Sequence, residues 1–321
     1  MNAPRQPSTL DRLFAPQWAG GWVVARVVFA AALLATHLPR AAGIGDVYGV
    51  QDILFTMGPL TLNQTIVWSE GSAWALWGGG LLGLGGLLFG GRAAKPGLLL
   101  WLVTTALLLV NETLNIKAYD RLNLWLCLAF FLAPIGERTL QDKWRSPVAR
   151  WVLLIIFCGL YGSTGWLKAL KEPSWWTTGD VLAYHLLHPY FGMKPIGVWV
   201  SAQPWIVLPL CWATVLFEAS FPFLVWWRRT NPWLLLAGLL MHLGIGLFMN
   251  VGPFSYVALA AYPALLRPEL AQKIYEGHIA NRRSALKPPG RLEPRGALPI
   301  KVHSGARPSA DRPDPDPDRL G

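Results

Sequence analysis

Long runs of apolar residues, separated by short polar segments, fill the chain from about residue 20 to residue 266. Crossing the hydrocarbon core of a bilayer takes roughly 20 residues at about 1.5 Å per residue. Eight runs come close to this length, the fourth and the last being the shortest. They cover residues 22–38, 73–91, 97–113, 122–135, 150–170, 204–227, 232–250 and 254–266. The pattern predicts an all-α, polytopic membrane bundle of about eight transmembrane helices.

The second run is rich in glycine, and its glycines recur four residues apart. Gly79 and Gly83 form one such pair, and Gly86 and Gly90 form another. Small residues at this spacing let two helices approach closely in lipid. Neither a predicted strand nor a Lys-Ser/Thr pair accompanies these glycines, so helix packing is favoured over a phosphate-binding loop.

The basic residues between the spans predict the orientation of the chain. With a cytoplasmic N-terminus, the inner connections and the N-terminal segment hold ten Lys and Arg residues, against six in the longer outer connections. An even number of spans then places both termini in the cytoplasm. We therefore expect a multi-pass protein of the cell membrane, with a cytoplasmic segment at 1–19, a transmembrane domain at 20–266 and a basic, largely disordered cytoplasmic tail at 267–321.

Composition supports the membrane class and weakens others. Hydrophobic residues make up 53% of the chain and charged residues only 14%. The net charge of +10 is explained by orientation and by contact with anionic lipid, so nucleic acid is not an expected partner. The three cysteines lie singly inside apolar runs, which argues against a disulfide framework.

Two charges fall at similar depth near the inner side of the membrane. Arg26 lies a few residues into the first span, and Glu218 lies nine residues before Trp227. Because isolated charges are costly in lipid, we predict a structural ion pair between Arg26 and Glu218.

Lys168 is predicted near the outer end of its span, on one helix face with Tyr161 and Gly165. One interpretation is that its ammonium snorkels to the interface or pairs with Glu112. The other is that burial makes it a base or a charge clamp. His185 and His188 have the spacing of two metal ligands but no convincing third ligand, so no metal site is predicted.

A set of residues at characteristic spacing resembles the HTTM domain, the membrane domain shared with vitamin K-dependent gamma-carboxylases. The resemblance covers roughly residues 18–266 and is sharpest over 161–266. Its residues are Tyr161, Gly165, Lys168, Trp175, Gly179, Glu218, His242 and the run Gly252-Pro253-Phe254-Ser255-Tyr256.

The resemblance implies a lipid-soluble quinol as substrate, such as vitamin K hydroquinone, in a pocket on the extracytoplasmic side. Lys168 would be the base and His242 a second catalytic residue. The substrate would contact Tyr161, Trp175, Asn250 and Ser255. The alternative is a non-enzymatic membrane partner or maturation factor that presents residues 170–202 to a secreted peptide or protein. A transporter is a third interpretation, but no internal repeat supports it.

Overall fold

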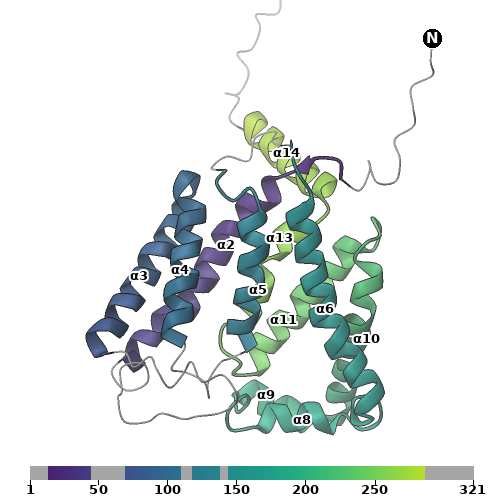
Figure 1. Cartoon of the computed structure of the whole chain (residues 1–321). Coiled ribbons are helices and arrows are strands. Elements are labelled where there is room, and N and C mark those ends of the chain that lie inside the picture. Colours follow the sequence, from purple (N-terminus) through teal and green to yellow (C-terminus); the bar gives the residue numbers. More distant parts are fainter. Residues whose placement is uncertain (1–13, 45–68, 110–117, 138–143, 286–321) are drawn as a thin grey trace, which may run out of the picture. The chain divides into compact units, whose positions relative to one another are not determined.

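The computed structural model describes residues 14–44, 69–109, 118–137 and 144–285 of the chain (Figure 1). Helices account for nearly all of the regular structure in these ranges. The strands in the described ranges are β1 (Gln17–Trp18) and β2 (Trp144–Arg145), which pair antiparallel. The prediction of an all-α fold is therefore confirmed.

Six helical segments in the described ranges are long and apolar enough to cross a membrane. At about 1.5 Å per residue they span roughly 27–36 Å, which matches the hydrocarbon thickness. We therefore treat the chain as a multi-pass membrane protein. The segments are α2 (Gly20–His37) with the 3-10 turn η1 (Leu38–Gly43), α3 (Glu70–Phe89), α4 (Ala94–Leu109) with the 3-10 turn η4 (Gly91–Ala93), α6 (Val148–Lys171), α10 (Pro204–Leu224) and α11 (Asn231–Phe248).

The remaining predicted spans are shorter helices. The fourth corresponds to α5 (Ala118–Leu132), and the last is divided into α12 (Phe254–Ala260) and α13 (Tyr262–Leu265). Because these helices are short, the count of eight spans stays a prediction. The cytoplasmic location of the termini also stays a prediction.

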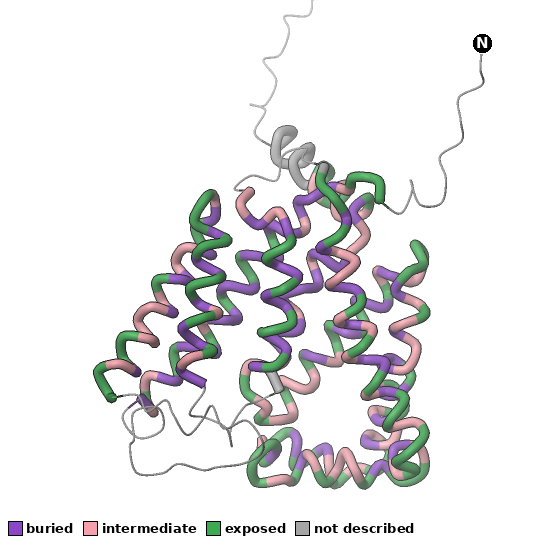
Figure 2. Tube along the Cα trace, viewed as in Figure 1, coloured by how far each residue is buried: buried purple, intermediate pink, exposed green. Residues whose placement is uncertain are grey.

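The outward faces of the long helices are apolar. Leu82, Ile155 and Leu240 are among many large hydrophobic side chains that are mostly exposed, and Figure 2 shows exposed positions alternating with buried ones along the helices. A large apolar surface of this kind marks contact with lipid or another apolar partner. The burial pattern thus agrees with the hydropathy of the helices.

The glycine-rich helix α3 packs closely against α4, as its glycine spacing predicts. A Cβ atom on Gly83 would lie 2.6 Å from the carbonyl oxygen of Gly97, and a Cβ on Gly97 would lie 2.5 Å from the carbonyl oxygen of Gly83. Each helix therefore needs its glycine at the crossing point, where the two backbones touch.

A second close contact joins α6 to α10 and positions the site described below. Gly162 faces the ring of Pro222, and a Cβ on Gly165 would lie 2.4 Å from the backbone nitrogen of Ala219. These contacts set α6 and α10 antiparallel and bring their backbones together at Gly165.

Three short helices connect α6 to α10 and run across the ends of the long helices (Figure 1). They are α7 (Ser174–Thr177), α8 (Asp180–Leu187) and α9 (Pro195–Ser201). Gly179 takes a φ of +77° between α7 and α8, a left-handed conformation that glycine adopts without strain. Lys194 anchors the start of α9 to α11, because its Nζ donates to the carbonyl oxygen of Gly246 at 2.6 Å.

The tail, predicted from the sequence to be largely disordered, begins with helix α14 (Pro268–Ala285). The main compact unit of the chain extends to Glu276, beyond the predicted boundary at 267. Contact between the rings of Tyr275 and Trp18, whose centroids are 5.7 Å apart, explains why the first part of α14 belongs to this unit. Residues 286–321 lie outside the described ranges.

Candidate functional site

The site is organised around an ion pair between α6 and α10. Lys168 Nζ donates to Glu218 Oε1 at 2.8 Å and to Glu218 Oε2 at 2.7 Å. The Glu218 side chain is 9% exposed and the Lys168 side chain 22% exposed. The carboxylate is therefore enclosed, whereas the amine keeps a face that can be reached from outside.

The pair forms because the two helices meet at Gly165, one turn before Lys168. The backbone of Glu218 and Ala219 fills the place that a larger side chain at position 165 would occupy. Side chains on a helix lean toward its N-terminus, so Lys168 leans back along α6 toward the level of Glu218. Gly165 thus allows α6 and α10 to come into contact, and Lys168, one turn further on, provides the positive charge that pairs with Glu218.

The predicted ion pair between Arg26 and Glu218 is wrong. Arg26 Nη1 donates instead to the carbonyl oxygens of Leu87 at 3.0 Å and Leu88 at 3.2 Å, at the C-terminal end of α3. The last carbonyls of a helix have no partner within the helix and carry its partial negative charge, so they can satisfy a buried guanidinium. Glu218 has Lys168 as its partner.

Trp175 covers the ion pair from helix α7. Lys168 Nζ lies 4.8 Å from the centroid of the Trp175 ring, a distance typical of a cation–π contact. The indole nitrogen of Trp175 donates to Glu172 Oε2 at 2.7 Å, which fixes the ring. Trp175 therefore lies beside Lys168, and its contact with a substrate stays a prediction.

A second polar group lies two helical turns away on the same face of α6. Tyr161 is seven residues before Lys168, or about 10 Å along the helix axis. Its hydroxyl is 2.7 Å from His242 Nε2 and 2.9 Å from the hydroxyl of Tyr262. Phe217, which precedes Glu218 in α10, packs edge-on against the Tyr161 ring at 5.1 Å between centroids. Two consecutive residues of α10 thus contact the two polar groups: Phe217 contacts Tyr161, and Glu218 contacts Lys168.

We expect Tyr161→Phe to destabilise the protein more than Tyr262→Phe. The first change removes both hydrogen bonds and leaves the imidazole of His242 and the Tyr262 hydroxyl without that partner, at about 1–3 kcal/mol for each buried group left unsatisfied. The second change keeps the bond between Tyr161 and His242. Chemical unfolding of both variants in the same detergent measures the difference in the free energy of unfolding. An equal decrease in both variants would contradict the central position of the Tyr161 hydroxyl between His242 and Tyr262.

The remaining predicted residues have different surroundings. The ring of His242 contacts the ring of Phe254 at 5.8 Å, and the next residue, Ser255, is buried at the start of α12. His242 Nδ1 and Ser255 Oγ have no hydrogen-bond partner within the described ranges. Asn250, two residues after the end of α11, is exposed. The structure thus brings together Tyr161 and His242, and separately Lys168, Glu218 and Trp175.

The two histidines of the predicted metal-like spacing make local contacts in and after α8. His185 Nδ1 is 2.7 Å from the carbonyl oxygen of Val181, and His188 Nδ1 accepts from the backbone nitrogen of Tyr190 at 3.1 Å. Within the described ranges, no group of three or more His, Cys, Asp or Glu side chains is placed to hold a metal ion.

Another set of buried polar groups, which the sequence did not single out, lies between α2 and α5. Arg40, in η1, forms a buried ion pair with Asp120. His37 Nε2 is 2.9 Å from the carbonyl oxygen of Trp77, and Asn123 is buried without a hydrogen-bond partner in the described ranges. In the sequence, His37 and Arg40 are three residues apart, and so are Asp120 and Asn123. This spacing places each pair on one helix face and could have indicated a buried polar group.

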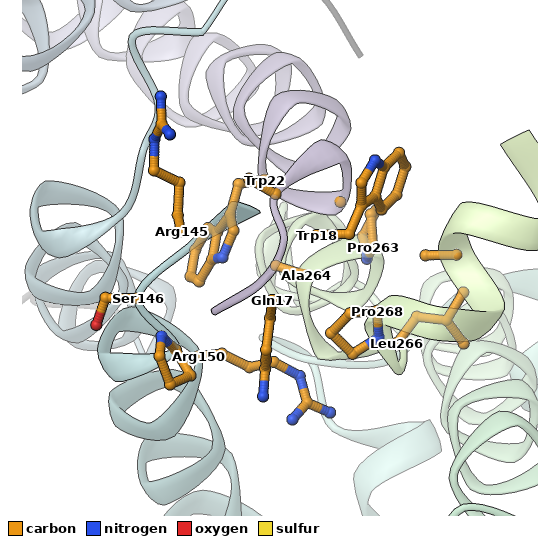
Figure 3. Close-up of a pocket in the computed structure, with 14 residues that line it drawn as sticks. Gln17, Trp18, Trp22, Arg145, Ser146, Arg150, Pro263, Ala264, Leu266 and Pro268 are labelled. Atoms are coloured by element: carbon orange, nitrogen blue, oxygen red, sulfur yellow. The ribbon is translucent and has the colours of Figure 1, made fainter. Parts of the chain in front are cut away.

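A small cavity lies at the other end of α6, between β1, β2, α6 and the α13–α14 connection (Figure 3). Its volume of about 20 Å³ is that of roughly one water molecule. Gln17 and Arg150 both line it, and Arg150 Nη2 donates to the carbonyl oxygen of Leu265 at 3.2 Å. Gln17 Oε1 and Arg150 Nε have no hydrogen-bond partner in the described ranges. Arg150 is 18 residues before Lys168, about 27 Å along α6, so this cavity is too small and too distant to belong to the site.

Comparison with protein-family models, with curated proteins and with solved structures finds no match to this chain. The resemblance to the HTTM domain therefore stays a prediction, which rests on the residues themselves.

Proposed function

We propose that this protein is a membrane protein of the HTTM type that binds a lipid-soluble quinol beside Lys168 and removes a proton from it. The observation that supports this most is the partly buried pair of Lys168 and Glu218, covered by Trp175. An intramembrane ionisable group is costly and is a functional candidate by default. A hydrogen-bonded Tyr161 and His242 lie on the same side of α6 at the distance of about two turns.

The access route supports a lipid-soluble substrate. Lys168 keeps 22% exposure, and the neighbouring Trp166, Leu167 and Leu170 are large, exposed and apolar. In a bilayer these side chains face acyl chains. A quinol ring could therefore approach the amine sideways from lipid, without passing through water.

The pair has the chemistry of a proton acceptor. For Lys168 to act as the base, the proton that it donates to Glu218 would move onto the carboxylate and leave a free amine. The free amine accepts the proton of a quinol hydroxyl, and the quinolate remains beside the new ammonium. Molecular oxygen is the co-reactant that the family resemblance implies for the next step. Tyr161 and His242 would orient the far side of the ring.

The test is oxygen-dependent turnover of a hydroquinone by the purified protein in lipid nanodiscs, with quinone and epoxide products separated by chromatography. We expect Lys168→Met to abolish turnover. Lys171→Met is the matched control, because Lys171 lies one turn further on in α6 and is exposed. Turnover that survives in Lys168→Met, or that is absent from the wild-type protein, would contradict the proposal.

A second candidate function is favoured by the surface of the α7–α9 segment. Tyr184, Tyr190, Met193 and Trp199 are all more than half exposed there. Such an apolar surface could present the segment to a secreted peptide or to another membrane protein, with no chemistry at Lys168. Crosslinking through photoreactive groups at Tyr184 and Trp199, in wild type and in Lys168→Met, separates the two functions: equal capture of one partner by both proteins favours the second.

A further inference from the structure

A large cavity, wide open on one side, lies where α3 turns into α4 and α5 ends. This is the end of the bundle opposite the α7–α9 segment (Figure 1). Its volume is about 560 Å³. Its wall combines the α3–α4 turn with the end of α5 and with β2. The charged residues of this wall are Arg92, Lys95, Glu137 and Arg145.

The charge of the wall is positive. The wall carries three cationic side chains and one carboxylate, that of Glu137. Arg145 Nη2 donates to Glu137 Oε1 at 2.7 Å, so one of the three cations is paired with this carboxylate. Arg92 and Lys95 have no acidic partner within the described ranges, and Lys95 Nζ lies 5.6 Å from the centroid of the Phe131 ring. The cavity therefore offers two unmatched positive charges to a ligand.

The backbone holds this wall in place. Gly90 and Gly91 have φ values of +73° and +67°, which allow the sharp turn from α3 into η4. A Cβ on Gly136 would lie 3.1 Å from the carbonyl oxygen of Gly91, so the turn and the end of α5 touch. Arg145 is fixed from the other side by the pairing of β2 with β1. The cations are thus carried by elements that contact one another.

The cavity lies at the level where lipid headgroups are expected. Phe89, at the end of α3, is 77% exposed, and Leu99 and Leu100 are exposed one turn beyond Lys95 in α4. These side chains mark the edge of the apolar belt, and the cations are within about one turn of it. Leu132, Ala133 and Pro134 add an apolar side to the cavity. A ligand that fits has an anionic group next to an apolar body.

We propose that this cavity binds the phosphate group of an anionic phospholipid, held by Arg92 and Lys95 with the acyl chains along α4 and α5. Basic pockets between membrane helices bind anionic headgroups by the same combination of charge and depth. The proposal is independent of the quinol site, because Lys168 lies at the opposite end of the bundle.

The experiment is native mass spectrometry of the full chain in detergent, titrated with phosphatidylglycerol or with zwitterionic phosphatidylcholine. We expect wild type to retain phosphatidylglycerol at least tenfold more tightly than phosphatidylcholine. The double variant Arg92→Gln/Lys95→Gln should lose this preference. The matched control is Arg228→Gln/Arg229→Gln, which removes the same charge from exposed residues after α10, at the same end of the bundle. It should stay within twofold of wild type.

Two results would overturn the proposal. The first is a loss of phosphatidylglycerol binding in the control variant as large as that in the Arg92/Lys95 variant. This would mean that the general positive charge of the surface, and not this cavity, binds the lipid. The second is full displacement of the lipid by millimolar inorganic phosphate, since that would assign the cavity to a free anion. Unchanged unfolding of the Arg92/Lys95 variant, expected because both side chains are exposed, excludes loss of fold as the cause.

Discussion

Glu218→Gln is expected to lower the free energy of unfolding by about 3 kcal/mol, because it leaves the Lys168 ammonium without its carboxylate inside the bundle. Removing one member of a buried ion pair typically costs 3–5 kcal/mol. The lower end applies here because the Lys168 side chain keeps 22% exposure and retains the ring of Trp175.

The double variant Lys168→Met/Glu218→Gln measures the energy of interaction between the two residues, apart from the contribution of each one alone. Replacing both charges removes the unpaired ammonium, so we expect the double variant to be more stable than Glu218→Gln alone and close to wild type. Lys171→Met, which changes an exposed lysine of the same helix, should have almost no effect. The measurement is reversible unfolding in mixed micelles. A double variant whose loss equals the sum of the two single losses would show that the residues are not coupled.

The second large effect is expected for Gly165→Ala. The new Cβ would lie 2.4 Å from the backbone nitrogen of Ala219 and 2.6 Å from the carbonyl carbon of Glu218, and backbone atoms cannot turn aside as a flexible side chain does. Overpacking of this kind costs about 1–3 kcal/mol or more. The better helix propensity of alanine returns only about 1 kcal/mol. We therefore expect net destabilisation and a wider separation of Lys168 from Glu218.

Gly159→Ala is the control for this effect. Gly159 lies in the same helix, and a Cβ there would meet no atom within 4 Å. The propensity gain then acts alone, so this variant should be as stable as wild type or slightly more stable. Unfolding of both variants, together with hydroquinone turnover, tests the contact. Equal stability of the two variants would mean that α6 and α10 do not touch at Gly165.

The sequence predicted the membrane class, the positions of the long helices and the shared face of Tyr161, Gly165 and Lys168. These features depend on hydropathy and on the helical period, which are local properties. Lys168 and Tyr161 remained recognisable as a group for the same reason. Tyr262 was missed, because nothing in the spacing of the last span indicates which hydroxyl reaches across to α6.

The partner of Lys168 could not be predicted, because depth does not decide which helices are neighbours. Glu218 was placed near the inner side by counting from the end of its own span. In the structure Gly165 faces Glu218 fourteen residues after the start of α10 but only six residues before the end of α6. Helix α10 therefore extends about 12 Å beyond α6. The α7–α9 segment packs beside this extension, and so Lys168 is covered by Trp175.

Arg26 and Glu218 each have a partner other than the one that the sequence predicted. Arg26 satisfies the end of α3 and has a structural role, whereas Glu218 moves from the structural pair to the candidate site. In the proposed function, a proton acceptor made of Lys168 and Glu218 replaces the single lysine that the sequence suggested. The proposed chemistry then depends on Glu218 as much as on Lys168.

The most direct test of this account is an experimental structure of the full chain in lipid nanodiscs with an added quinone. We expect density for the quinone ring beside Trp175, with a ring oxygen about 3 Å from Lys168 Nζ. A ring bound elsewhere in the bundle, or a Lys168–Glu218 pair surrounded only by side chains and acyl chains at saturating quinone, would contradict it.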